Sequence, residues 1–296
     1  MRILRRSMLF IPGNSPNMIQ NAGILGADSI ILDVEDAVSI DEKDSARNLI
    51  MHALEEVDFY GCEVVVRVNA PSTAFGEKDL REITPKRPDA FMIPMATEEE
   101  IRLADAIISE IEKEEGIEVG SIKLVPIAET AYAVESIADI IRTSKRIEAV
   151  LLGAEDLTAD MEISRTKEGG EIYYARNKIA NICKAFKIQA IDTPFADVSD
   201  SKGLIEDTLK GKSLGMTGKA AINPRQVDTI HHVYTPSQEE IQYAKSVIDA
   251  MKEANKAGKG VFSFEGKMID APIILRAETV IRKAILAGML NEEAMK

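Results

Sequence analysis

Short apolar runs alternate with longer amphipathic segments along the first 224 residues, and this alternation limits the fold more than any other feature. The runs have the length and composition of strands, and there are eight of them: 7–13, 28–36, 62–69, 89–95, 122–129, 148–156, 187–195 and 217–224. They are apolar on both faces, as expected when helices cover a parallel sheet. Each gap between them is long enough for a helix. The pattern therefore predicts an α/β fold, and the count of eight favours a closed (β/α)8 TIM barrel over an open doubly wound sheet.

The sequence pattern changes after residue 235, where the alternation of apolar runs and helical segments ends. Two long helical patterns, 236–258 and 273–290, are separated by an extended, glycine-containing stretch at 259–272. We therefore expect a barrel domain over 1–235 and a C-terminal helical extension over 236–296. The exposed length of this extension suggests that it packs on a neighbouring subunit of a homo-oligomer.

The composition excludes several classes of protein. Lys and Arg total 36 and Asp and Glu total 49, and a net charge of −13 argues against a general nucleic-acid binder. No apolar stretch approaches the roughly 18 residues of a membrane helix, and the apolar run near the N-terminus is too short for a signal peptide. Two cysteines in separate apolar segments form no disulfide framework. These features predict a soluble cytoplasmic protein.

Acidic residues gather at the ends of the expected strands, where barrels carry out their chemistry. Glu35 and Asp36 end the second strand, Glu129 the fifth, and Glu155 and Asp156 the sixth. Converging carboxylates repel one another unless a cation joins them, and hard oxygen ligands suit Mg2+. The pattern favours Glu129 and Asp156 as a pair of metal ligands. The acids of the second strand also have a simpler interpretation, as caps of the following helix.

Two arguments narrow the metal site. Adjacent side chains on an extended chain point to opposite sides, so we expect only one of Glu155 and Asp156 to reach the metal directly. We assign that role to Asp156 and a supporting or structural role to Glu155. Zinc would need His or Cys, but His231 and His232 are adjacent and diverge by about 100° on a helix, and His52 lies within the second helix.

Basic residues offer anion sites. Arg2, Arg5 and Arg6 precede the first strand, as a solvated tail or as an anion site near the barrel mouth. Arg67 lies inside the apolar run "VVVRVN" and needs a carboxylate partner, either a structural acid or a substrate. Lys219 lies in the eighth strand, where barrels often bind phosphate.

Seven motifs occur in the order seen in citrate lyase β-chains and the related malyl-CoA lyases of the HpcH/HpaI aldolase superfamily: "RRSMLFIPGN", "DSIILDVEDAV", "VVVRVN", "PIAET", "LGAEDL", "GKAAINPRQV" and "GKMIDAP". The resemblance covers roughly residues 5 to 290. Asn223 stands where many relatives have His, which makes the chain most similar to the β-chains. Met95 departs from the pattern, because relatives usually have a lysine there.

The resemblance implies a set of site residues. Mg2+ would be held by Glu129 and Asp156, Arg67 would bind the oxaloacetate end of the substrate, and Glu35 and Asp36 would lie close to the metal and its waters.

The resemblance also implies that Asp270 of a neighbouring subunit closes over the thioester, and either Asp36 or Asp270 is the candidate acid–base group. Arg5, Arg6, Lys219 and Arg225 are candidates for the anionic arm of the acyl carrier, and Asn223 is a further candidate for substrate binding.

The implied reaction is cleavage of a citryl thioester to oxaloacetate and an acetyl thioester. In the citrate lyase complex the thioester is carried by an acyl carrier protein, which works with an α subunit and the β-chain; the β-chain itself is expected to form a trimer or hexamer. Two alternatives remain open. One is a free-standing malyl- or citramalyl-CoA lyase or related aldolase, and the other is a non-catalytic scaffold that docks an acyl carrier protein.

Overall fold

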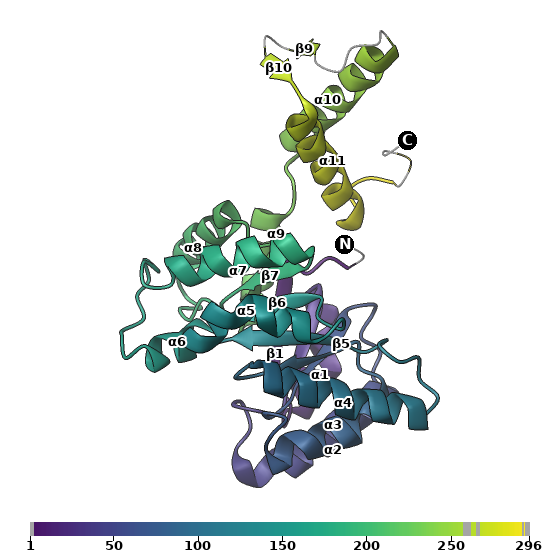
Figure 1. The fold of residues 1–296 in the computed structure, drawn as a ribbon, viewed down its shortest axis with the longest axis vertical. Helices are drawn as coiled ribbons and strands as arrows, with labels where there is room; N and C mark the ends of the chain where they lie inside the picture. Colours follow the sequence, from purple (N-terminus) through teal and green to yellow (C-terminus); the bar gives the residue numbers. More distant parts are fainter. Residues whose placement is uncertain (1–2, 257–261, 265–266, 292, 294–296) are drawn as a thin grey trace. The chain divides into compact units, whose positions relative to one another are not determined.

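The computed structural model describes residues 3–256, 262–264, 267–291 and 293, and eight parallel strands close into a barrel in sequence order (Figure 1). The strands are β1 (Ser7–Pro12), β2 (Ser29–Asp33), β3 (Glu63–Arg67), β4 (Ala90–Ile93), β5 (Lys123–Ala128), β6 (Ala149–Leu152), β7 (Gln189–Asp192) and β8 (Gly218–Ala221). The ring closes because β8 pairs with β1 as well as with β7. The prediction of a (β/α)8 barrel is confirmed.

Helices follow the strands and cover the outside of the barrel (Figure 1). They are α1 (Pro16–Asn21), α2 (Lys43–Glu56), α3 (Ala74–Ile83), α4 (Glu98–Glu114), α5 (Ala131–Thr143), α6 (Ala154–Asp160), α7 (Tyr173–Phe186), α8 (Ser201–Leu214) and α9 (Val227–Tyr234). Thr73, Thr97 and Thr130 cap α3, α4 and α5 by accepting a backbone N–H three residues on. The connections that follow β3, β4 and β5 thus end in polar capping residues, where the next helix begins.

Apolar side chains at alternate strand positions fill the barrel interior. The buried cluster consists of Met8, Ile31, Val65, Ala90, Met92, Val125, Ile127, Ala149, Leu151, Ile191 and Ala220, with Phe10 packed against it. Because side chains alternate across a strand, the residues between these positions face the surrounding helices. This phase determines which charged residues can reach the barrel axis.

The C-terminal part forms a second compact unit. The chain divides into Arg5–His231 and a unit of Met1–Leu4 with His232–Lys296. In the second unit α10 (Gln238–Lys256) and α11 (Ala271–Leu286) share an apolar core, and β9 (Phe262–Phe264) pairs with β10 (Lys267–Ile269). Within the described residues, no helix is long and apolar enough to cross a membrane.

Candidate active site

The strand phase brings three charged residues to the mouth of the barrel interior. Asp33 ends β2, Arg67 ends β3 and Glu129 directly follows β5, and each lies two residues beyond a side chain of the interior cluster. Asp33 and Arg67 are also register partners on neighbouring strands. Alternation therefore points all three toward the barrel axis, at the end where the strands finish.

Arg67 is held by a structural acid. Its Nε lies 2.8 Å from Asp33 Oδ1 and its Nη2 2.5 Å from Asp33 Oδ2, a two-point ion pair. The guanidinium lies over the Phe10 ring, with 5.0 Å to the centroid. The remaining nitrogen, Nη1, is 3.0 Å from Glu35 Oε2 and 3.5 Å from Asp36 Oδ2. Asp33 therefore fixes the plane of the guanidinium and leaves Nη1 directed at the two acids that follow β2.

Glu35 is a partly buried acid whose charge is poorly satisfied. Its Oε2 is inaccessible to solvent and makes no hydrogen bond of good geometry with any described residue, although Arg67 Nη1 lies 3.0 Å away as an ion-pair partner. Burial raises the pKa of Glu35 to about 7; Arg67 opposes the shift, and Asp36 and Asp33 add to it. Because the contact with Arg67 is an ion pair without a well-aligned hydrogen bond, a further cation or a bound water at this buried oxygen would lower the free energy.

Glu129 is a deeply buried acid at the mouth. It is 4% exposed, and its Oε1 accepts a hydrogen bond of 2.5 Å from the Met95 backbone N–H. Burial raises the pKa of Glu129 to about 8, the Met95 N–H opposes this, and the charges of Asp156 and Glu35 add to it. Asp156 thus lies close enough for its charge to disfavour ionisation of Glu129. A divalent cation would offset this effect.

Glu155 and Asp156 lie in a helix and not in a strand, which corrects the expected strand of 148–156. Strand β6 ends at Leu152, and both acids belong to the first turn of α6. Strand alternation therefore cannot separate them; neighbouring helical side chains diverge by about 100° instead. The cation that meets Glu155 is Arg165, with Nε 3.5 Å from Oε1. The assignment of Asp156 to the metal stays a prediction.

The acids at the mouth suit a hard cation that keeps much of its water. Among the described residues, no group of three His, Cys, Asp or Glu side chains could hold a metal ion by itself. Glu129 and Asp156 would supply two carboxylate oxygens, and water or substrate oxygens would have to complete the shell. Mg2+ binds in this way, with one or two protein carboxylates.

Arg5 and Arg6 do not lie at the mouth, so the predicted anion site there is wrong. Arg5 is 1% exposed and makes a two-point ion pair with Glu63, with 2.7 Å from Nε and 2.5 Å from Nη2. Arg6 binds Asp28 through its backbone and side chain. Both acids lie at the amino ends of strands, opposite the mouth. Arg2, the third residue of the predicted cluster, lies outside the described residues.

Lys219 is buried behind the barrel wall and is not accessible to a phosphate, which corrects a second prediction. Because Ala220 faces the interior, Lys219 points outward, where its Nζ lies 3.1 Å from Asp192 and 2.6 Å from Asp207. Arg176 binds the same two acids at 2.8 and 2.7 Å. Lys219 is fully buried and belongs to a neutral cluster of two cations and two anions that ties α7 and α8 to the barrel.

The remaining predicted residues have local structural roles. Asn223 follows β8 and caps the short 3-10 helix Pro224–Gln226, accepting the Arg225 N–H at 3.0 Å. The Arg225 side chain is exposed. Asp270 lies in the C-terminal unit and caps α11, accepting the Ile273 N–H at 3.4 Å. Contacts of these side chains with a substrate stay predictions.

Asp33 is the residue of the mouth that the sequence left without a role. The signal that could have identified it is positional, because Asp33 and Arg67 occupy the last positions of consecutive parallel strands. Such residues face the same side when the strands pair in register. Of the two predicted partners for Arg67, a structural acid or a substrate carboxylate, the structural acid Asp33 binds two of its three nitrogens.

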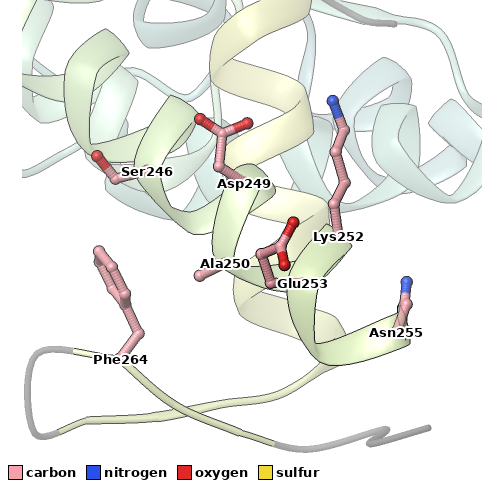
Figure 2. A pocket seen from close by; sticks show the side chains of 7 residues that line it. All are labelled: Ser246, Asp249, Ala250, Lys252, Glu253, Asn255 and Phe264. Carbon is pink, nitrogen blue, oxygen red and sulfur yellow. The ribbon is translucent and has the colours of Figure 1, made fainter. Parts of the chain in front are cut away.

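A separate groove of about 790 Å3 lies in the C-terminal unit (Figure 2). It is lined by one side of α10, including Asp249, Lys252 and Glu253, and by Phe264 of β9. No candidate residue of the barrel mouth lines it, so it is not part of the site described above.

Known proteins share both the sequence and the fold. The family model for HpcH/HpaI aldolase/citrate lyase matches residues 6–224. The citrate lyase subunit beta of Leuconostoc mesenteroides subsp. cremoris is 40% identical over 98% of this chain and 96% of its own. The human mitochondrial citramalyl-CoA lyase is 35% identical over 95% of this chain and 86% of its own.

A solved structure extends the likeness to three dimensions. The protein CitE of Mycobacterium tuberculosis, in complex with magnesium, acetoacetate and coenzyme A, matches with a TM-score of 0.77 and 27% identity over 96% of this chain and 99% of its own. The resemblance read from the seven motifs is confirmed. This chain belongs to the HpcH/HpaI aldolase/citrate lyase family.

Proposed function

We propose that the protein is the β subunit of a citrate lyase, a Mg2+-dependent carbon–carbon lyase that cleaves a citryl thioester to oxaloacetate and an acetyl thioester. The observation that carries the proposal is the burial of Glu129, which is only 4% exposed. Burial raises the pKa of its carboxyl group to about 8, and the charge of Asp156 adds to this shift. Among the described residues no cationic side chain forms an ion pair with Glu129. The 40% identity to the Leuconostoc citrate lyase subunit beta supports the choice of reaction.

The side chains at the mouth suit a retro-Claisen cleavage. Bound Mg2+ would stabilise the alkoxide of the citryl C3 hydroxyl and polarise the ketone that forms from it. Arg67, with its plane fixed by Asp33, would neutralise a substrate carboxylate through Nη1 and orient the oxaloacetate end. A base must accept the hydroxyl proton before the carbon–carbon bond breaks, and the thioester enolate that leaves with the bonding electron pair must be protonated at carbon to give the acetyl thioester. Asp36, Asp270 and Glu35 are the candidates for this acid–base group. Burial raises the pKa of Glu35 to about 7, and a pKa in that range suits proton transfer near neutral pH.

We also propose the partners. The thioester would be carried by an acyl carrier protein, with an α subunit completing the complex, and Asp270 would reach the site from a neighbouring copy in a trimer or hexamer. With Arg5, Arg6 and Lys219 engaged elsewhere, the exposed Arg225 is the remaining candidate for the anionic arm of the carrier.

The direct test is release of oxaloacetate from citryl-CoA in the presence of Mg2+. Glu129→Gln is expected to abolish activity and retain the fold. Glu155→Gln is the matched control, because Glu155 is 65% exposed and faces Arg165, and it should retain most activity. Persistent activity in Glu129→Gln would show that the metal assignment is wrong.

The second candidate function is a citramalyl- or malyl-CoA lyase, and the 35% identity to the human citramalyl-CoA lyase favours including it. Parallel assays with citramalyl-CoA and malyl-CoA distinguish it: cleavage of either, with citryl-CoA left intact, would select this function. A non-catalytic scaffold would cleave none of the three, and would have no need of the charged set at the mouth.

A further inference from the structure

The Glu129 carboxylate lies between two backbone segments that the proposed chemistry has not used. Strand β5 pairs with β4 on one side and β6 on the other, so the turns that follow those strands flank Glu129. Met95, in the turn after β4, donates its N–H to Oε1 at 2.5 Å. Gly153, directly after β6, donates its N–H to the Ala128 carbonyl at 3.1 Å and lies against the other side of the carboxylate.

The backbone of Met95 is in a conformation that residues with a side chain rarely adopt. Its φ is +47°, in the left-handed region, where the Cβ crowds the following carbonyl. Packing of the side chain does not explain this, because Met95 is 48% exposed. The strained conformation does direct the N–H at Glu129 Oε1. Strain at a mouth residue that aims a donor at a buried acid indicates a positioning role.

Gly153 supplies space and not conformational freedom. Its φ is −92°, which any residue adopts. A Cβ at this position would lie 2.5 Å from the Glu129 Cβ and 2.8 Å from Oε2, with the Ile127 Cγ2 at 3.0 Å. Since the Glu129 Cβ lies next to the backbone, it cannot move aside as the end of a flexible chain would. Any side chain at 153 would displace the Glu129 carboxylate.

We propose that Met95 and Gly153 are positioning residues for Glu129: the left-handed turn at Met95 holds Oε1, and the missing side chain at Gly153 leaves Oε2 free to face the metal. This inference rests on the proposed function, in which Glu129 is a ligand of Mg2+. It assigns to the backbone of Met95 a role that its side chain does not have. Oε2 is thereby the oxygen offered to the cation.

The first test compares two Gly→Ala variants. Gly153→Ala is expected to weaken Mg2+ binding by ~10-fold or more, as for loss of a group that orients a metal ligand. Gly170→Ala is the control, because a Cβ there meets nothing within 4 Å and the glycine has no positive φ. The dissociation constant of Mg2+ is measured by titration calorimetry on the full chain, with the thermal midpoint of each variant recorded. Unchanged Mg2+ affinity in Gly153→Ala would overturn the inference.

The second test separates the backbone of Met95 from its side chain and does not depend on Gly153→Ala folding. Both Met95→Gly and Met95→Val keep the N–H, but glycine accepts a positive φ and β-branched valine resists it. Met95→Gly should bind Mg2+ as the unaltered protein does. Met95→Val should bind it several-fold more weakly, since its N–H leaves Oε1. Equal affinities in the two variants would overturn the role of the turn.

The same titrations separate this inference from the proposed function. If the unaltered protein binds Mg2+ and Glu129→Gln does not, the metal site stands, and the Gly153 and Met95 variants alone decide the positioning role. If Glu129→Gln binds Mg2+ as tightly as the unaltered protein, the metal assignment fails, and the inference fails with it.

Discussion

Replacing Lys219 by methionine tests whether this lysine holds the barrel together or binds an anion. In the structure it is fully buried and bonded to Asp192 and Asp207, which also bind Arg176. Two cations thus balance two anions, and Lys219→Met leaves an uncompensated negative charge. Breaking a buried pair in this way lowers the free energy of unfolding by ~3–5 kcal/mol. This is a large part of the ~5–15 kcal/mol that a typical domain has.

The assay is urea unfolding followed by circular dichroism at neutral pH. Lys202→Met is the matched control, because Lys202 is exposed and its contact with Glu206, one turn further along α8, is 3.9 Å long. Its effect should stay within ~0.5 kcal/mol. Adding Asp207→Leu to Lys219→Met removes the unpaired charge and should recover at least ~1 kcal/mol. The reasoning is refuted if Lys219→Met unfolds at the same urea concentration as the unaltered protein.

Three further predictions follow from the ionisable groups. Burial raises the pKa of Glu129 to about 8 and of Glu35 to about 7, from an ordinary value of 4.5. Between pH 4.5 and those values, these two groups therefore bind more protons in the folded protein than in the unfolded chain. Without metal, the thermal midpoint of the protein should fall as pH rises through that range. The increase in thermal midpoint on adding Mg2+ should become larger as pH rises, and an increase that is constant from pH 6 to 9 would contradict this. Arg67→Lys keeps the charge but loses the two-point ion pair, and KM for the thioester should rise ~10-fold or more in steady-state assays. Glu63→Gln removes the two-point partner of the buried Arg5 and leaves it only a 3.3 Å contact with Glu148, so it should lower the free energy of unfolding by ~3–5 kcal/mol, with an unchanged KM.

The fold was accessible from the sequence because the repeat is local. Eight apolar runs separated by helical patterns specify strands, helices and a covered parallel sheet without knowledge of any long-range contact. The run at 148–156 shows the limit of this reasoning. Its apolar part becomes β6, but the helix begins at Ala154, since an acidic first turn such as that of Glu155 and Asp156 favours a helix N-terminus.

The candidate site was accessible in part, for a related reason. Residues at the carboxyl ends of barrel strands meet at one mouth, so Arg67 and Glu129 could be placed together from their positions in the chain. Arg5 and Arg6 could have been placed as well, because residues that precede a strand belong to the opposite end. Lys219 could have been predicted to point away from the barrel axis, because its neighbour Ala220 faces the interior and adjacent residues of a strand alternate.

The sequence by itself determined the barrel, the family and the end of the barrel where the acids gather, because each of these depends on patterns that are local or repeated. Only the tertiary structure decided which charges pair with each other. Asp192 and Lys219 of β7 and β8 meet Arg176 and Asp207 of α7 and α8 behind the barrel wall, and Glu129 is held by a backbone N–H and by the absence of a side chain. Such contacts depend on how strands and helices pack in three dimensions, and a backbone donor or an empty volume leaves no residue pattern that marks it.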